Sequence, residues 1–327
     1  MTICLNYTMY KKEMKILVGY LPEEYPGVEV FNSLGQTMFK KYDRDWLNKN
    51  IQTFDIIITH LFETIDSELI DKAVRLKILA TPSTGTDHIE KSLLSSRNIQ
   101  LVTLNDDRDF IDTISSTAEL AWLLILACAR KLPALINRVL IDQKWVNTDI
   151  RGIELQGKSI GIIGYGRLGK KMAEYANAFK MNVLSYDSSE VAFENKLSFV
   201  KNVELDELLS NSDVITLHVK LNDTSKNLIG IKQIQQMKNG VILINTSRGG
   251  LIDSDAVLNG LNSGKISSIG VDALNNEYQS TKLPDDVLIK AAMEDSRIII
   301  TPHVGGSTFD SHAKVFAKLG ELISKHI

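Results

Sequence analysis

Short runs of apolar residues alternate along the chain with segments in which apolar residues recur every three or four positions. An apolar run bounded by polar residues is typical of a strand buried in a parallel sheet, whereas the three-to-four-residue spacing is typical of an amphipathic helix. In the first third of the chain this pattern predicts strands at 15–19, 55–59, 77–80 and 100–103, and helices at 30–46, 67–74 and 89–95. Because strands and helices alternate, we expect a small α/β unit with a parallel sheet.

The second half repeats this alternation. Strands are predicted at 159–163, 182–186, 214–219, 241–245, 266–271 and 297–300, helices at 170–179, 205–209, 231–237 and 254–261, and a last helix at 311–325. The fold class is therefore α/β, with two doubly wound parallel-sheet domains, the second of about six strands. Between the halves, residues 113–130 form a helix that is apolar on nearly every face, which predicts that it joins two domains or lies in a subunit interface.

A glycine-rich turn separates the strand at 159–163 from the helix that follows. It has the pattern G-x-G-x-x-G, formed by Gly164, Tyr165, Gly166, Arg167, Leu168 and Gly169. The first glycine permits the tight turn, the second lets the backbone approach a pyrophosphate, and the third lets the helix pack close to the strand. The helix N-terminus favours the phosphate charge. This stretch predicts a dinucleotide site.

Asp187 lies at the end of the next strand, eighteen residues after Gly169. At this spacing a carboxylate can accept a hydrogen bond from a ribose 2′-hydroxyl, and its charge repels a 2′-phosphate. Ser188 and Ser189 follow without an adjacent arginine. The sequence therefore favours NAD over NADP as the cofactor.

The composition agrees with a globular protein of two domains. The 327 residues are 44% hydrophobic and 24% charged, with a net charge of −3 and two cysteines, Cys4 and Cys128. Without a long basic run, nucleic acid and anionic membranes are poor partners, and no zinc pattern or other metal site is predicted. The apolar run at 120–129 is about half the length of a membrane span. We expect a soluble, cytoplasmic protein whose first 13 residues are a ragged extension before Met14.

Polar residues follow the predicted strands at the edge where such sheets bind ligands. Ser83, Thr84 and Gly85 follow the strand at 77–80. In the second half, Thr246, Ser247 and Arg248 follow the strand at 241–245. Asp272 and then Glu277 follow the strand at 266–271, and His303 comes after the strand at 297–300. One arginine, one glutamate and one histidine at neighbouring strand ends are the outline of a catalytic site.

Six motifs in this order resemble the D-isomer-specific 2-hydroxyacid dehydrogenases, which include phosphoglycerate dehydrogenase and the glyoxylate/hydroxypyruvate reductases. The motifs are STGTDHI (83–89), TAELAWLLIL (117–126), GYGRLG (164–169), INTSRGGLID (244–253), GVDALNNE (270–277) and TPHVGGST (301–308). The resemblance implies a Rossmann NAD-binding domain (113–304) inserted into a flavodoxin-like substrate domain (1–112 and 305–327), with the active site in the cleft. It also implies a homodimer formed through the NAD-binding domain, and the apolar 120–129 segment is consistent with this.

The resemblance further implies the role of each site residue in interconverting a small D-2-hydroxy acid and its 2-oxo acid. His303 matches the proton donor, Glu277 the acid that hydrogen-bonds it, and Arg248 the clamp for the substrate carboxylate, which Ser83, Thr84 and Gly85 complete. An imidazole can exchange a proton near neutral pH, and a guanidinium holds a carboxylate with two hydrogen bonds. Asp272 matches the residue that binds the nicotinamide carboxamide. The remaining cofactor contacts are assigned to His218, Val219, Thr224, Thr246, Ser247 and Gly305.

The chain departs from the family pattern at several positions. Lys220 replaces a usual proline, Tyr278 a proline after the catalytic glutamate, and Lys180 a glycine before the second strand. The loop at 59–63 lacks the arginine with which relatives bind phosphorylated substrates, which argues against 3-phosphoglycerate unless another cation supplies the charge. A non-enzymatic NAD(H)-sensing protein on the same fold remains the alternative function, and the complete set of Arg248, Glu277 and His303 argues against it.

Overall fold

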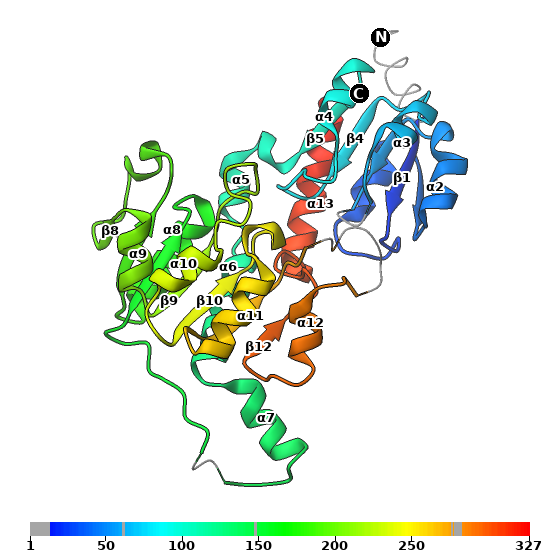
Figure 1. Cartoon of the computed structure of the whole chain (residues 1–327). Coiled ribbons are helices and arrows are strands. Elements are labelled where there is room, and N and C mark those ends of the chain that lie inside the picture. The colour runs from blue at the N-terminus through cyan, green and yellow to red at the C-terminus, as the bar shows by residue number, and fades with distance from the viewer. Residues whose placement is uncertain (1–13, 61–62, 147–148, 276, 278–282) are drawn as a thin grey trace. The chain divides into compact units, whose positions relative to one another are not determined.

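A computed structural model describes residues 14–60, 63–146, 149–275, 277 and 283–327, and its chain divides into two compact units (Figure 1). The first unit contains the chain up to Ile114 and Ser307–Ile327, and the second contains Ser115–Glu277 and Leu283–Gly306. The predicted insertion of one α/β domain into another is therefore confirmed. The sequence predictions for 1–13, for Leu61 and Phe62 in the 59–63 loop, and for Tyr278 lie outside the described residues.

The first unit has a five-stranded parallel sheet in the order β2-β1-β3-β4-β5. The strands are β1 (Lys15–Gly19), β2 (Gln36–Lys40), β3 (Ile56–Ile58), β4 (Ile78–Thr81) and β5 (Gln100–Thr103). The helices are η1 (Val28–Ser33), α2 (Arg44–Asn50), η2 (Ile51–Thr53), α3 (Ser67–Lys72), α4 (Lys91–Ser96), η3 (Leu104–Asp106), α5 (Arg108–Asp112) and α13 (Phe309–Ser324). One face of the sheet packs on η1 and α13, and the other packs on α2, α3 and α4.

The predicted helix at 30–46 is wrong, because this stretch forms the end of η1, the strand β2 and the start of α2. Gly35 lets the chain enter β2 close to Met14, because a Cβ atom there would lie 2.4 Å from the Met14 carbonyl oxygen, which accepts a hydrogen bond from Gln36 N. Asp43 then begins a new helix, since its side chain accepts a hydrogen bond from Trp46 N. Gly35 and Asp43 are both local signals in the sequence. The strand between them, β2, is an edge strand with little apolar burial, so its hydrophobic pattern is weak.

The second unit has a seven-stranded parallel sheet in the order β12-β11-β10-β9-β6-β7-β8, one strand more than predicted. The strands are β6 (Ser159–Ile163), β7 (Asn182–Tyr186), β8 (Val200–Asn202), β9 (Val214–Leu217), β10 (Val241–Asn245), β11 (Ile266–Val271) and β12 (Ile298–Ile300). The helices are α6 (Ser116–Ala129), α7 (Leu132–Leu140), α8 (Arg167–Ala178), η4 (Glu190–Phe193), α9 (Leu205–Asn211), α10 (Ile231–Gln236), η5 (Gly249–Leu251), α11 (Ser254–Ser263) and α12 (Val287–Ala292). The extra strand, β8, has only three residues and one buried side chain, so it leaves almost no pattern in the sequence.

The apolar helix α6 is a core helix of the second unit. It packs against β10, β11 and α8, and most of its residues are buried without any partner chain. Residues Arg108–Ala129 are long and apolar enough to meet a composition test for a membrane span, but packing on the sheet explains this composition. Most of the apolar surface of α6 is thus used inside the domain, although Leu123 is 55% exposed, and the subunit interface expected from this helix stays a prediction.

Candidate active site

The dinucleotide fingerprint has the predicted order of strand, turn and helix. Gly164, directly after β6, has a φ of 98°, and its N–H donates to the Tyr186 carbonyl over 2.8 Å. Gly169 lies in the first turn of α8, where a Cβ atom would come within 2.1 Å of the Gly164 carbonyl oxygen. Around Gly166, in contrast, a Cβ atom would meet no described atom within 4 Å. The open space beside Gly166 and the uncapped N-terminus of α8 form a cradle that fits a pyrophosphate.

Two buried polar atoms near this cradle have no hydrogen-bond partner among the described residues. They are Nδ1 of His218, after β9, and Oγ1 of Thr246, after β10. His218 donates its backbone N–H to Ile163 over 2.7 Å, and its Nε2 lies 2.9 Å from the Thr216 hydroxyl. Buried polar atoms are normally satisfied, so these two fit hydrogen bonds to a bound dinucleotide. Burial of the ring lowers the pKa of His218 to about 3, so the imidazole is neutral.

Asp187 follows β7 and is held by the backbone around it. Its Oδ2 accepts from Tyr165 N over 2.8 Å, and its Oδ1 accepts from Ser189 N over 3.0 Å. The side chain of Tyr165 belongs to the core: it is fully buried, stacks on Phe193, and accepts a hydrogen bond from Leu197 N. Tyr165 can therefore reach a cofactor only through its backbone.

The structure brings Glu277 and His303 together, although they are 26 residues apart. His303 Nδ1 lies 2.8 Å from Glu277 Oε1, and the two side chains are only 15% and 10% exposed. Glu277 Oε2 accepts from Leu274 N over 3.1 Å, which fixes the carboxylate. His303 has a φ of 52°, an unfavourable conformation for a residue with a side chain. The pair is a histidine whose one ring nitrogen is held by a carboxylate and whose other can exchange a proton.

Asp272 anchors the loop that carries His303. Its buried carboxylate accepts from the Thr301 hydroxyl over 2.6 Å, from Val304 N over 2.9 Å and from Gly305 N over 2.8 Å. Burial raises the pKa of Asp272, and these hydrogen bonds partly offset the effect. From the sequence, Asp272 was assigned to the cofactor, and the hydrogen bond from Thr301 to Asp272 was missed. The position of Thr301 directly after β12 was the signal that could have identified it.

Arg248 follows β10 and begins η5. Its Nη1 donates to the Ser247 carbonyl over 2.8 Å, and its own carbonyl accepts from Asn245 Nδ2 over 2.8 Å. A Cβ atom on the next residue, Gly249, would come within 2.1 Å of the Leu274 carbonyl carbon. The loop after β10 therefore lies against the loop after β11, which leads to Glu277.

The other predicted residues are held by local hydrogen bonds. In the first unit, Gly85 N donates to the Ser83 hydroxyl over 3.1 Å, and the Thr84 carbonyl accepts from Asn105 Nδ2 over 2.8 Å. In the second unit, the Ser247 hydroxyl donates to the Leu217 carbonyl, and Thr224 donates to Asn222 Oδ1 from both its N–H and its hydroxyl. Thr224 is exposed on the loop after β9, whereas Val219 is partly buried directly after that strand.

Comparison with known proteins agrees with the resemblance that the six sequence motifs indicate. The family model described as "D-isomer specific 2-hydroxyacid dehydrogenase, NAD binding domain" matches residues 122–305. The chain is 34% identical to D-3-phosphoglycerate dehydrogenase of Archaeoglobus fulgidus over 92% of its own length and 55% of the relative. It is 32% identical to hydroxypyruvate reductase of Thermotoga maritima, over 87% of its own length and 89% of the relative. The chain thus spans about half the length of the former and most of the latter.

A solved structure shows the same similarity in three dimensions. D-lactate dehydrogenase from Aquifex aeolicus, complexed with NAD and lactic acid, has a TM-score of 0.81 and 29% identity. The match covers 95% of each chain, so both units are included.

Proposed function

Because the chain belongs to the D-isomer-specific 2-hydroxyacid dehydrogenase family, we propose that it interconverts a small D-2-hydroxy acid and its 2-oxo acid with NAD. The observation that carries this proposal is the pair of His303 and Glu277 at 2.8 Å, in the same unit as the dinucleotide fingerprint. A protein that only binds NAD needs the fingerprint but has no need of a buried acid–histidine pair at the strand ends.

In the proposed reaction, His303 moves the proton and Glu277 assists it. During reduction, His303 Nε2 gives a proton to the carbonyl oxygen, and during oxidation it takes that proton back from the hydroxyl. Glu277 stabilises the imidazolium and keeps the ring oriented, because its carboxylate is itself fixed by Leu274 N. NAD, held by the glycine-rich turn and Asp187, would supply a hydride to the carbonyl carbon during reduction or accept it from that carbon during oxidation, which balances the two-electron change.

Arg248 and the loop after β4 would hold the substrate carboxylate. A guanidinium offers two parallel N–H groups to a carboxylate and polarises the adjacent carbonyl. Backbone N–H groups of Thr84 and Gly85, next to the Ser83 hydroxyl, would complete the set of donors. The match between these donors and a 2-oxo acid is the reason for preferring an acid over a neutral ketone as substrate.

We propose NAD rather than NADP because Asp187 carries its negative charge at the end of β7 and is fixed there by two backbone N–H groups. An Asp187→Ala variant is expected to weaken NADH binding about tenfold and to narrow the preference for NADH over NADPH. Titration of both coenzymes by fluorescence measures this. An unchanged preference would show that Asp187 does not contact the ribose.

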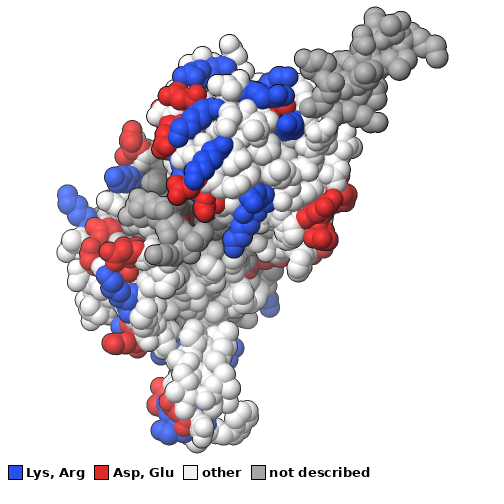
Figure 2. All heavy atoms as spheres, turned by 90° about the vertical axis from the view of Figure 1, so that its right-hand side faces the viewer, with Lys and Arg blue, Asp and Glu red and all other residues white. Residues whose placement is uncertain are grey.

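We also propose a homodimer formed by the second unit, with α7 in the contact surface. None of the residues of α7 is buried, and the chain after it keeps large apolar residues exposed: Leu140 by 73%, Ile141 by 70% and Trp145 by 90%. Figure 1 shows α7 extending away from the sheet of its own unit, and this lowest part is mostly uncharged in Figure 2. Such an exposed apolar surface is typical of a protein interface, and a second copy of the chain is its proposed partner.

A cytoplasmic location is proposed from the thiol that the structure describes. Cys128 is buried in α6, and burial raises its pKa to about 12, so it is kept as an unreactive thiol. Such a residue suits a reducing compartment. Cell fractionation with an antibody to the protein checks the assignment.

The test of the proposed reaction is oxidation of NADH in the presence of glyoxylate, pyruvate, hydroxypyruvate and 3-phosphohydroxypyruvate. We expect absorbance at the NADH band to fall with at least one of these acids, with formation of the D-hydroxy acid. If NADH binds but none of the acids is reduced, the NAD(H)-sensing alternative is favoured instead.

A further inference from the structure

The loop after β4, residues 82–87, carries the proposed donors for the substrate carboxylate, and none of its residues is buried. A loop that is not packed into a core depends on hydrogen bonds for its shape. Ser83 N donates to the Thr81 hydroxyl over 3.3 Å, and Gly85 N donates to the Ser83 hydroxyl over 3.1 Å. Both contacts join residues two positions apart, so they shape the loop without tying it to another element.

Asn105, in the loop after the neighbouring strand β5, adds a contact from outside. Its Nδ2 donates to the Thr84 carbonyl over 2.8 Å, and β4 and β5 are paired in the sheet (Figure 1). The carbonyl and the N–H of a planar trans peptide point in opposite directions, so holding the Thr84 carbonyl sets the direction of the Gly85 N–H. That N–H meets Ser83 Oγ. The Ser83 hydroxyl, which donates to none of the described residues, therefore keeps its proton for another acceptor.

The position of Asn105 is itself fixed by a network of the first unit. Asn105 N donates to the Thr103 hydroxyl over 3.2 Å, and Thr103 N donates to Asp106 Oδ2 over 3.1 Å. The next residue, Asp107, forms an ion pair of 3.0 Å with Lys318 of α13. The last helix of the chain thus braces the loop that presents Asn105.

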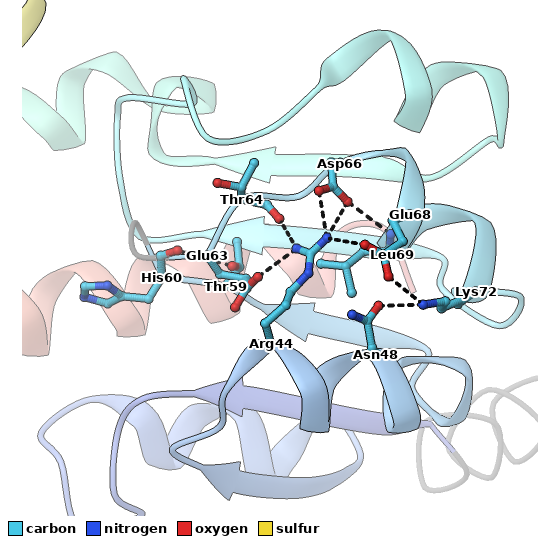
Figure 3. Close-up of polar contacts among 10 residues, drawn as sticks. All are labelled: Arg44, Asn48, Thr59, His60, Glu63, Thr64, Asp66, Glu68, Leu69 and Lys72. Carbon is cyan, nitrogen blue, oxygen red and sulfur yellow. Dashed lines mark hydrogen bonds and ion pairs between the residues drawn. The ribbon is translucent and has the colours of Figure 1, made fainter. Parts of the chain in front are cut away.

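The loop after β3 is held in a similar way by a side chain that does not belong to it. Arg44 of α2 donates to Glu63 Oε1 over 2.9 Å and to the Thr64 carbonyl over 2.6 Å, as Figure 3 shows. Arg44 and Asn105 therefore each bind a backbone carbonyl of a neighbouring loop. They differ in what the loop carries, because the carbonyl that Asn105 binds belongs to the proposed carboxylate site.

We propose that Asn105 is a positioning residue for the substrate: by holding the Thr84 carbonyl, it directs the donors of the loop after β4 toward the carboxylate of the 2-oxo acid. This inference rests on the proposed function and adds a residue to its substrate site. Asn105 lies in the first unit, whereas the dinucleotide fingerprint and His303 lie in the second. Its loss is therefore expected to weaken binding of the acid and to spare both the coenzyme and the proton transfer.

An Asn105→Leu variant tests the proposal by removing the donor without adding a charge. We expect the KM for the reduced acid to rise about fivefold, the effect of one lost hydrogen bond, with kcat and the KM for NADH within about twofold. Binding of oxamate, an unreactive carboxylate of the size of pyruvate, to the NADH complex should weaken by the same factor. Asn105→Asp keeps the shape of the side chain but replaces the donor with an acceptor, and should raise the KM at least as much.

The matched controls are Asn48→Leu and Asn48→Asp, which change an asparagine of the same unit whose Oδ1 accepts from Lys72 Nζ over 2.9 Å (Figure 3). They should leave the KM for the acid within about twofold of that of the unmodified protein. If the unmodified protein reduces none of the acids, the proposed function fails and this inference fails with it. If acids are reduced but the Asn105 variants match their controls, the dehydrogenase stands and the positioning role is overturned. A change in melting temperature without a separate rise in the KM for the acid would assign Asn105 to structure alone.

Discussion

The backbone conformation and the ring orientation of His303 are held by contacts with neighbouring residues. Its backbone is in a left-handed conformation with a φ of 52°, which costs about 1–3 kcal/mol and persists only where surrounding contacts enforce it. Asp272 supplies such contacts by binding the N–H groups of Val304 and Gly305, and Glu277 binds the ring. The positions of His303 and Glu277 after strands could be read from the sequence, but the role of Asp272 could not, because it depends on a loop returning to β11.

A His303→Ala variant is expected to lose at least about a hundredfold in kcat, since general acid–base catalysis contributes that much or more. NADH affinity should stay within about twofold, because no binding group of the fingerprint is changed. Steady-state kinetics and fluorescence titration measure the two quantities, with His326→Ala as a control at an exposed site. Retained turnover would mean that another group donates the proton.

His218 makes stability depend on pH. Its folded-state pKa of about 3 lies below the usual value of 6.5, so the unfolded chain takes up the proton first. The neutral, folded form is favoured above pH 6.5, and stability is lost as the pH falls from 6.5 toward 3. By pH 5 the loss amounts to about 2 kcal/mol.

Thermal unfolding of the protein without coenzyme should therefore show a lower melting temperature at pH 5 than at pH 7. A His218→Gln variant, which cannot be protonated, should show a smaller difference between the two pH values. His312 also has a pKa lowered by burial, so part of the dependence will remain in that variant. An identical pH dependence in both proteins would rule out a contribution from His218.

At the scale of elements, the strand–turn–helix of the dinucleotide fingerprint was predictable almost to the residue. The strands at 159–163 and 182–186 agree with β6 and β7, because both are apolar runs bounded by polar residues. Where the pattern was weak, prediction failed: β2 is an exposed edge strand, and β8 has three residues. Lys180 is the departure from the family's usual glycine, and its φ of 58° explains why glycine is the usual residue there.

Two glycines of the fingerprint are expected to respond differently to the same substitution. Gly169→Ala forces a Cβ atom to within 2.1 Å of the Gly164 carbonyl oxygen, so α8 must move away from β6. We expect this to lower the free energy of unfolding by about 2 kcal/mol or more. Gly166→Ala meets no described atom within 4 Å and should keep the melting temperature, while its methyl group blocks the pyrophosphate.

Thermal unfolding and NADH titration distinguish the two effects, and each variant serves as the control of the other. We expect lost stability for Gly169→Ala and lost NADH affinity, about tenfold or more, for Gly166→Ala. A Gly166→Ala protein with full NADH affinity would place the pyrophosphate elsewhere.

At the scale of the whole molecule, the chain leaves the first unit after Ile114 and returns at Ser307. The last helix, α13, then packs Phe316, Leu319 and Ile323 on the first sheet, where each buried side chain contributes about 2 kcal/mol. The second unit keeps its apolar α6 inside and leaves α7 without cover. Its exposed surface on α7 and the following residues is what the proposed dimer would bury.

A double variant, Leu140→Lys with Trp145→Lys, is expected to shift the protein from dimer to monomer, because two charges cannot be buried in an apolar interface. Light scattering after size-exclusion chromatography measures the mass. Met293→Lys, at a residue that is 75% exposed outside this surface, is the control and should remain a dimer. If the double variant keeps the mass of the unmodified protein, α7 is not the interface.

By itself the sequence determined the class of the fold, the dinucleotide fingerprint and the list of polar residues at strand ends, because these depend on local spacing along the chain. Only the tertiary structure decided which of those residues meet. Glu277 contacts His303, and Asp272 contacts Gly305, because β11 and β12 are neighbours in the sheet. Likewise, Arg44 of α2 donates hydrogen bonds to the carboxylates of Glu63 and Asp66. Contacts between segments far apart in the sequence depend on strand order and packing, and hydrophobic periodicity carries no information on either.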